Sequence, residues 1–188
     1  MIIYDLEIQK LVPPRDGKIL PDFNYCAGWT DYVGMGLACL ALYDCVRQEY
    51  HVFDEFNLDQ IQKRFDKTDL IVGFNILKFD NNILRAYDIK IQDSKCYDLL
   101  AEIARAAGTP NDFKGLSLNA ICEANFKSGK TGDGADAPKL YQTKNFGSLF
   151  NYCMADVRLT KKLFDRVIDA GHIINPRNNQ WIRVNRPR

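Results

Sequence analysis

The first eight residues, MIIYDLEI, form an apolar run that two acidic positions interrupt. Six of these eight side chains are apolar or aromatic, which is typical of a strand buried within a sheet. Asp5 and Glu7 are two positions apart, so in a strand their carboxylates project side by side from one face. Two such charges about 6 Å apart repel by roughly 3 kcal/mol at an effective dielectric of about 20. The pattern therefore requires something that offsets this repulsion.

The rest of the chain alternates between strand-like and helix-like patterns, which predicts an α/β fold. Strands are predicted at 32–44 and 45–53, joined by a tight turn into an antiparallel meander, at 70–75, and as a short edge strand at 93–98. Helical periodicity is found at 57–69, 77–88, 99–107, 116–126 and 146–168. Residues 10–29 are predicted to form a long surface loop, 127–139 a Gly-rich connector, and 170–188 a basic tail or hairpin.

Two further acids occupy positions that the helical pattern assigns to the core. Apolar or aromatic residues follow Asp80 at i+3, i+4 and i+7, so Asp80 lies on an apolar stripe. Leucines follow Asp156 at i+3 and i+7, so Asp156 also lies on an apolar stripe. Tyr152 precedes Asp156 by four residues and shares its helix face. Four carboxylates and one phenol therefore need a common explanation.

Composition narrows the choice of chemistry. The 188 residues, 46% of them hydrophobic, suffice for one sizeable core, so we expect one domain spanning residues 1–188. With 25 basic and 24 acidic side chains the net charge is +1, which neither indicates nucleic acid nor excludes a local basic groove. Six scattered cysteines and two histidines do not indicate a zinc site, and suit buried thiols in a reducing cytosol. Neither a signal peptide nor a membrane span is expected, so we predict a cytoplasmic location without membrane contact.

Carboxylate clusters persist in protein cores when cations neutralise them. Hard divalent ions such as Mg²⁺ or Mn²⁺ take oxygen ligands and need neither His nor Cys. Two such ions about 4 Å apart clamp the attacking and leaving oxygens of a phosphodiester during in-line displacement. The misplaced acids therefore favour metal-dependent phosphoryl transfer.

Three short motifs resemble, in order, the exonuclease motifs of the DEDD superfamily. They are DLE at Asp5 to Glu7, NILKFD at Asn75 to Asp80, and YCMAD at Tyr152 to Asp156. The tyrosine form of the superfamily (DEDDy) is the closer match, because the other branch carries a histidine where this chain has Asn151. The segments GFNILKFDNNILR and YCMADVRLTKKLF look like the proofreading domain of family B DNA polymerases and its stand-alone relatives in bacteria and phages. In motif order the resemblance covers about residues 1–170.

The resemblance implies a ribonuclease H-like (RNase H-like) fold and release of mononucleotides from a 3′ end. It implies two Mg²⁺ or Mn²⁺ ions held by Asp5, Glu7, Asp80 and Asp156, with Tyr152 holding the attacking water. The expected sheet combines the antiparallel meander with parallel strands and is flanked by helices. The expected partner is single-stranded nucleic acid, with DNA favoured and RNA possible. We assign substrate contacts to Asn75, Phe79 and Lys130. The location would be bacterial cytoplasm, or host cytoplasm if the chain is phage-encoded.

Other interpretations exist for each feature taken singly. The acidic pair could lie on a salt-bridged edge strand, Asp80 could cap a helix, and Tyr152 could be a core tyrosine with a satisfied hydroxyl. The lysines of the connector suit contact with phosphate, and a solvated loop explains them equally well. A non-catalytic nucleic-acid-binding or scaffold module and an endonuclease of the same fold are the alternative functions. SGKT at 128–131 is not a phosphate-binding P-loop, because the required first glycine would fall at Ala124.

Overall fold

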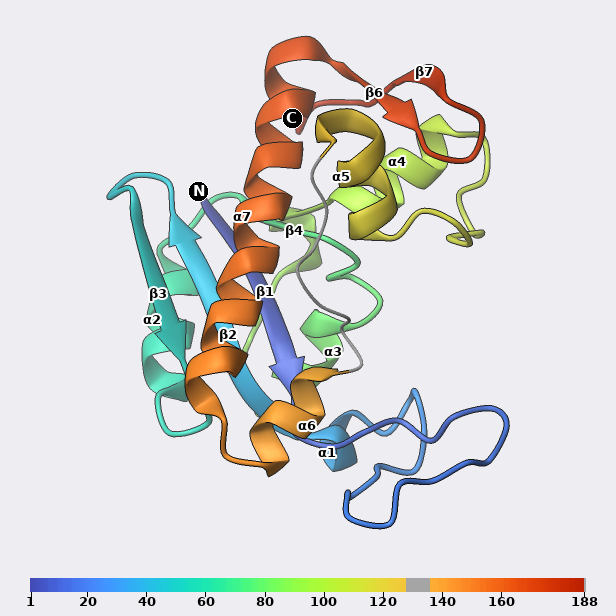
Figure 1. Cartoon of the computed structure of the whole chain (residues 1–188). Helices are drawn as coiled ribbons and strands as arrows, with labels where there is room; N and C mark the ends of the chain where they lie inside the picture. The colour runs from blue at the N-terminus through green and yellow to red at the C-terminus, as the bar shows by residue number, and fades with distance from the viewer. Residues whose placement is uncertain (128–135, 188) are drawn as a thin grey trace.

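Five strands form a mixed sheet at the centre of the molecule (Figure 1). This computed structural model describes residues 1–127 and 136–187. The strands of the sheet are β1 (Ile2–Ile8), β2 (Leu37–Asp44), β3 (Glu49–Phe53), β4 (Ile71–Gly73) and β5 (Cys96–Asp98). Their order is β3-β2-β1-β4-β5; the first three pair antiparallel, and β4 pairs parallel with both β1 and β5. The predicted fold, an antiparallel meander extended by parallel strands in an RNase H-like α/β sheet, is confirmed.

Helices cover both faces of this sheet, and a small hairpin follows the last helix (Figure 1). The helices are α1 (Tyr32–Met35), α2 (Leu58–Asp66), α3 (Asp80–Ala86), α4 (Leu99–Ala106), α5 (Leu118–Phe126), α6 (Ala137–Gln142) and α7 (Phe146–Ala170), with a 3₁₀ turn η1 (Asp93–Lys95). The hairpin consists of β6 (His172–Asn175) and β7 (Gln180–Arg183). Of the two expectations for residues 170–188, a basic tail or a hairpin, the structure has a hairpin at these strands.

The side chains of β1 alternate between two hydrophobic clusters, one on each face of the sheet. Ile2, Tyr4 and Leu6 pack with residues of α2 and α3. Ile3 packs on the other face, with residues of α4, α5 and α7. Because successive strand side chains point to opposite faces, Asp5 and Glu7 continue the face of Ile3 towards α7.

Helix α7 lies across that face and brings the third sequence motif to the sheet (Figure 1). It begins after Asn145, whose side chain accepts a hydrogen bond from the Ser148 N–H, and ends at Gly171 in the left-handed conformation. Its buried residues recur at helical spacing from Leu149 to Val167, and Asp156 is among them. The predicted placement of Asp156 on the buried stripe is confirmed.

Three element boundaries differ from the sequence-based expectation. Residues Tyr32–Met35 form a short helix rather than the start of a strand, because Asp31 caps it and Gly36, at φ 70°, ends it. Helix α3 begins at Asp80, since residues 75–79 form a tight turn in which the Asn75 carbonyl accepts the Phe79 N–H. Helix α6 starts inside the segment predicted to be a connector, with a proline in its first turn.

Two expectations from composition can be compared with the structure. All six cysteines lie in the described part of the chain and are free thiols. Among the helices formed by residues 1–127 and 136–187, none combines the length and apolar character needed to cross a membrane.

Candidate active site

A cavity of about 700 Å³ lies where the end of β1 meets α3 and α7. Asp5 and Glu7 line it from β1, Asp80 from the first turn of α3, and Tyr152 and Asp156 from α7. These elements are far apart in the sequence, so only the fold brings the five residues together. A second cavity, of about 610 Å³, lies at the hairpin of β6 and β7 and has no acidic residue in its lining.

Asp5 and Glu7 form a close acidic pair in the first cavity. Ligand atoms of Asp5, Glu7 and Cys153 lie within 4.8 Å of one another. Cys153 is fully buried, and its thiol donates to the backbone carbonyl of Asp5 at 3.4 Å. Burial raises the pKa of this thiol well above its usual range, so it remains protonated. Within this cluster the two carboxylates are therefore the groups that could hold a metal ion, and Cys153 packs beside them.

Asp80 reaches β1 from the beginning of α3. Its side chain is buried, with 3% of the residue exposed, and one oxygen accepts the Leu6 N–H at 3.3 Å. Burial raises the pKa of Asp80 to about 7, and the charge of Asp98 acts in the same direction. A divalent cation in the cavity would favour the ionised carboxylate, so the environment of Asp80 suits a metal ligand.

Helix α7 supplies the remaining two predicted residues. Asp156 is buried and Tyr152 is partly buried one helical turn before it. Both line the cavity opposite β1. The structure thus places a phenol and a carboxylate on one helix face, as the spacing predicts.

The predicted substrate-contact residues have different outcomes. Asn75 and Phe79 both line the cavity. Asn75 adopts φ 66°, in the left-handed region that asparagine tolerates better than most side chains. Lys130 lies outside the described residues, so its predicted phosphate contact stays a prediction.

Three aromatic residues that line the cavity, Trp29, Phe74 and Phe113, were not found by sequence reasoning. Trp29, on the loop after β1, is 65% exposed and lies edge-on to Phe79 with ring centroids 6.2 Å apart. Phe113 also lines the cavity, and the Lys78 ammonium lies 4.1 Å from its ring centroid. An exposed tryptophan in a polar loop was the available signal for Trp29; Phe113 carries no comparable signal.

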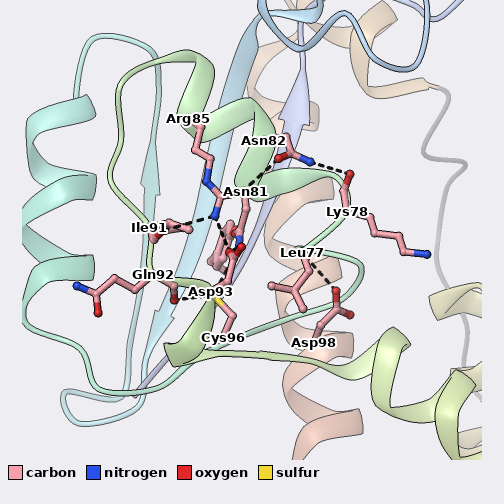
Figure 2. Close-up of polar contacts among 11 residues, drawn as sticks. Leu77, Lys78, Asn81, Asn82, Arg85, Ile91, Gln92, Asp93, Cys96 and Asp98 are labelled. Carbon is pink, nitrogen blue, oxygen red and sulfur yellow. Dashed lines mark hydrogen bonds and ion pairs between the residues drawn. The ribbon is translucent and has the colours of Figure 1, made fainter. Parts of the chain in front are cut away.

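Asp98, at the end of β5, is a further residue that the sequence did not indicate. Its carboxylate accepts four backbone N–H groups, from Asn75, Leu77, Leu100 and Ala101, at 2.9 to 3.3 Å. Figure 2 shows the bond to Leu77. Asp98 therefore joins the turn before α3 to the first turn of α4.

Behind the cavity, a buried hydrogen-bond network ties α3 to β1. The Tyr4 hydroxyl donates to Asn81 Oδ1 at 2.5 Å, and Asn81 Nδ2 donates to Asp93 Oδ1 at 2.9 Å. Arg85 forms an ion pair with Asp93 at 2.6 Å (Figure 2). Tyr4 directly precedes Asp5, and Asn81 directly follows Asp80. This network therefore fixes the position of α3, which carries Asp80, relative to β1, which carries Asp5.

Comparisons with known proteins support the fold. No protein-family model and no curated protein matches the sequence. A family B DNA polymerase from the hyperthermophilic archaeon Pyrobaculum calidifontis is similar in structure, with a TM-score of 0.59 and 15% sequence identity. That similarity covers 89% of this chain but 24% of the polymerase chain. The structure of exonuclease I aligns with a TM-score of 0.44 and 17% identity, over 88% of this chain and 40% of the other.

Proposed function

We propose that residues 1–188 form one metal-dependent 3′-to-5′ exonuclease domain of the DEDDy type. It hydrolyses phosphodiester bonds of single-stranded nucleic acid, with DNA favoured and RNA possible, and releases mononucleotides. The observation that carries this proposal is the single cavity lined by four carboxylates and one tyrosine from three separate elements. Fold similarity to a family B DNA polymerase is consistent with it.

The donor set of the cavity fits hard divalent cations. Asp5, Glu7, Asp80 and Asp156 offer carboxylate oxygens, the ligands that Mg²⁺ and Mn²⁺ prefer. Burial of Asp80 makes an unneutralised charge there costly, which a cation would offset. We assign two ions to these four residues. When bound, they would supply charge neutralisation for an in-line displacement at phosphorus.

The remaining residues act on water and substrate. Tyr152, which shares its helix face with Asp156, orients the attacking water through its hydroxyl. Asn75 and Phe79 contact the terminal nucleotides from the turn before α3, and Lys130 contacts a phosphate. Trp29 and Phe113 offer ring faces on which bases of any sequence can stack, which favours single strands over duplex.

Digestion of end-labelled oligonucleotides tests the proposal. Single-stranded DNA and RNA, labelled at either end, are incubated with Mg²⁺, Mn²⁺ or EDTA. We expect 3′-labelled strands to release labelled mononucleotide at once and 5′-labelled strands to shorten progressively, with a 3′-terminal phosphorothioate slowing both. EDTA abolishes the reaction. Shortening that starts from the 5′ end contradicts the proposal.

The same assay distinguishes the alternative functions. Cleavage of circular single strands would identify an endonuclease. Retention of single strands in a binding assay without any product, in either metal, would identify a non-catalytic binding module.

A further inference from the structure

Asp98 stands at the junction of two segments that border the cavity. It is the last residue of β5 and pairs in parallel register with Gly73, the last residue of β4. Residues 74–79, which include the tight turn at 75–79, connect Gly73 to Asp80, while α4 begins directly after Asp98. The residue is 4% exposed and is absent from the cavity lining, so its hydrogen bonds reach the site only through neighbouring residues, while its charge also raises the pKa of Asp80.

The Asp98 oxygen Oδ1 accepts three of the four backbone hydrogen bonds, and Oδ2 accepts one. Oδ1 accepts from Asn75 N at 2.9 Å, Leu100 N at 3.0 Å and Ala101 N at 3.3 Å. Oδ2 accepts from Leu77 N at 3.0 Å (Figure 2). Two bonds cap α4, and the other two hold the turn before α3.

Backbone hydrogen bonds and close packing also restrict the turn that Asp98 holds. Asn75 adopts φ 66°, and its carbonyl accepts the N–H groups of Lys78 and Phe79. A Cβ atom at Gly73 would lie 2.2 Å from Ile76 Cγ2, so the turn folds back directly onto the end of β4. A continuous hydrogen-bonded path therefore runs from Asp98 through Asn75 to Phe79, the residue before Asp80.

From this arrangement we infer that Asp98 is a positioning residue for the candidate metal site. Its carboxylate fixes the turn at residues 74–79 and so places the Asp80 carboxylate at the cavity. The inference rests on the proposed function for its effect on catalysis, whereas its effect on metal affinity and on the turn is measurable without catalysis. Outer groups that orient a ligand commonly change metal affinity or activity by about 10- to 100-fold when they are replaced.

Two substitutions separate the turn from the helix cap. In Asp98→Asn the amide oxygen can keep the three Oδ1 bonds, but the Nδ2 group then meets the Leu77 N–H, donor against donor. Asp98→Ser can still cap α4 but is too short to reach the turn. Asp44→Asn is the matched control, because Asp44 is also a buried acid whose carboxylate accepts backbone N–H groups, in the turn after β2.

Mn²⁺ titration, followed by electron paramagnetic resonance well below the melting temperature, is the first measurement. We expect Asp98→Asn and Asp98→Ser to weaken Mn²⁺ binding by about 10-fold or more. We expect kcat to fall about 10- to 100-fold with KM changed little, since misplacement by about 1 Å is costly to chemistry. Asp44→Asn should retain Mn²⁺ affinity and kcat. Equal effects in the Asp98 and Asp44 variants, or wild-type Mn²⁺ affinity in both Asp98 variants, would overturn the inference.

Amide hydrogen exchange on the wild-type chain is the second measurement, and it requires no variant. The Asn75 and Leu77 N–H groups should be protected to a degree similar to Leu100, because one carboxylate holds all three. Exchange of Leu77 as fast as an unstructured amide overturns the inference. If the wild-type chain binds Mn²⁺ but hydrolyses nothing, the proposed function fails while the affinity and exchange data still decide the role of Asp98.

Discussion

Buried acidic residues serve different purposes in this chain, and the atoms around each of them decide which. Asp44 pairs with the guanidinium groups of Arg47 and Arg64. The Asp98 carboxylate accepts four backbone N–H groups from two separate segments, which makes it a structural joint. Asp80 has one oxygen on the Leu6 N–H and lines the cavity, so it remains available for a ligand from outside the chain. Sequence position alone does not separate these three environments.

Tyr152 and the metal ligands should differ in how much activity their replacement removes. Asp5→Ala, Glu7→Ala and Asp156→Ala should each lower kcat by several orders of magnitude, because neutral side chains cannot hold the cations. Tyr152→Phe keeps the ring and loses one hydrogen bond of about 1 to 3 kcal/mol, so kcat should fall only about 10- to 100-fold. Metal affinity should stay unchanged in Tyr152→Phe. Single-turnover assays and Mn²⁺ titration measure both effects.

The matched control for this comparison is Tyr50→Phe, on the edge strand β3. It removes a phenolic hydroxyl away from the cavity lining and should leave kcat unchanged. Full activity in Tyr152→Phe would mean that Tyr152 only packs and that another group orients the water.

Trp29 should contribute to single-strand binding through stacking. Trp29→Ala should weaken binding of an oligonucleotide by about 5- to 100-fold, because stacking of one base on an aromatic ring contributes about 1 to 3 kcal/mol. Fluorescence anisotropy of a labelled strand in Ca²⁺ measures the dissociation constant. Trp181→Ala is the control, since Trp181 is similarly exposed, at 56%, but belongs to the hairpin. Equal weakening in both variants would show that Trp29 has no particular role.

At the scale of elements, each site residue depends on how its helix or strand is held. Helix α7 is anchored by a buried stripe over its whole length, so Tyr152 and Asp156 are carried by a rigid element. Helix α3 is short, and hydrogen bonds at its beginning and on Asn81 hold it to β1. The turn from β2 to β3 is held by the backbone hydrogen bond from Gln48 N to the Asp44 carbonyl and by the buried Asp44 carboxylate, which accepts the N–H groups of Val46 and Arg47.

Asp44→Asn should destabilise the fold without affecting the site. Burial raises the pKa of Asp44, but the Arg47 amide and guanidinium and the Val46 amide outweigh it, so the pKa lies below its usual value. At pH 7 the variant should lose about 1 to 3 kcal/mol, which lowers Tm by about 3 to 10 °C.

The same variant should show a defined pH dependence. Because the folded-state pKa of Asp44 is lowered, its stabilising effect is complete above the unfolded pKa of about 3.9 and is lost as the pH falls through the folded-state pKa. Thermal melts from pH 3 to pH 8 should therefore show a constant difference between wild type and Asp44→Asn above about pH 5 and a shrinking one below about pH 4. A difference that grows towards acid would contradict this assignment.

At the scale of the whole molecule, the cavity lies at one end of β1 and is lined by helices from both faces of the sheet. A bound cation would therefore crosslink β1, α3 and α7. Ligands that bind only the folded state raise its stability by mass action. Mg²⁺ or Mn²⁺ should therefore raise Tm, by an amount that increases with cation concentration. Differential scanning calorimetry with and without EDTA measures the effect.

Repulsion among the carboxylates predicts a companion result. Asp5→Asn removes one charge from the Asp5 and Glu7 pair, so it should melt at a higher temperature than wild type in EDTA and gain less from Mg²⁺. If cations leave both Tm and hydrolysis unchanged, the two-metal proposal is wrong.

Much of the fold followed from the sequence because periodicity is a local property. The alternation in MIIYDLEI placed Asp5 and Glu7 on one strand face, and helical spacing placed Asp80 and Asp156 on buried stripes. The structure confirms these placements. The motif order then indicated that these acids share a site. Their catalytic roles stay predictions.

What only the tertiary structure decided depends on contacts between distant segments. In the sequence Asp98 is only the last residue of a predicted edge strand, and it becomes a joint because parallel pairing of β4 with β5 brings the Asn75 and Leu77 N–H groups to it. Trp29 has no periodic pattern around it, and only folding of its loop sets it against Phe79. Local sequence determines which face a side chain takes, whereas the partner it meets there is set by chain segments that no local pattern specifies.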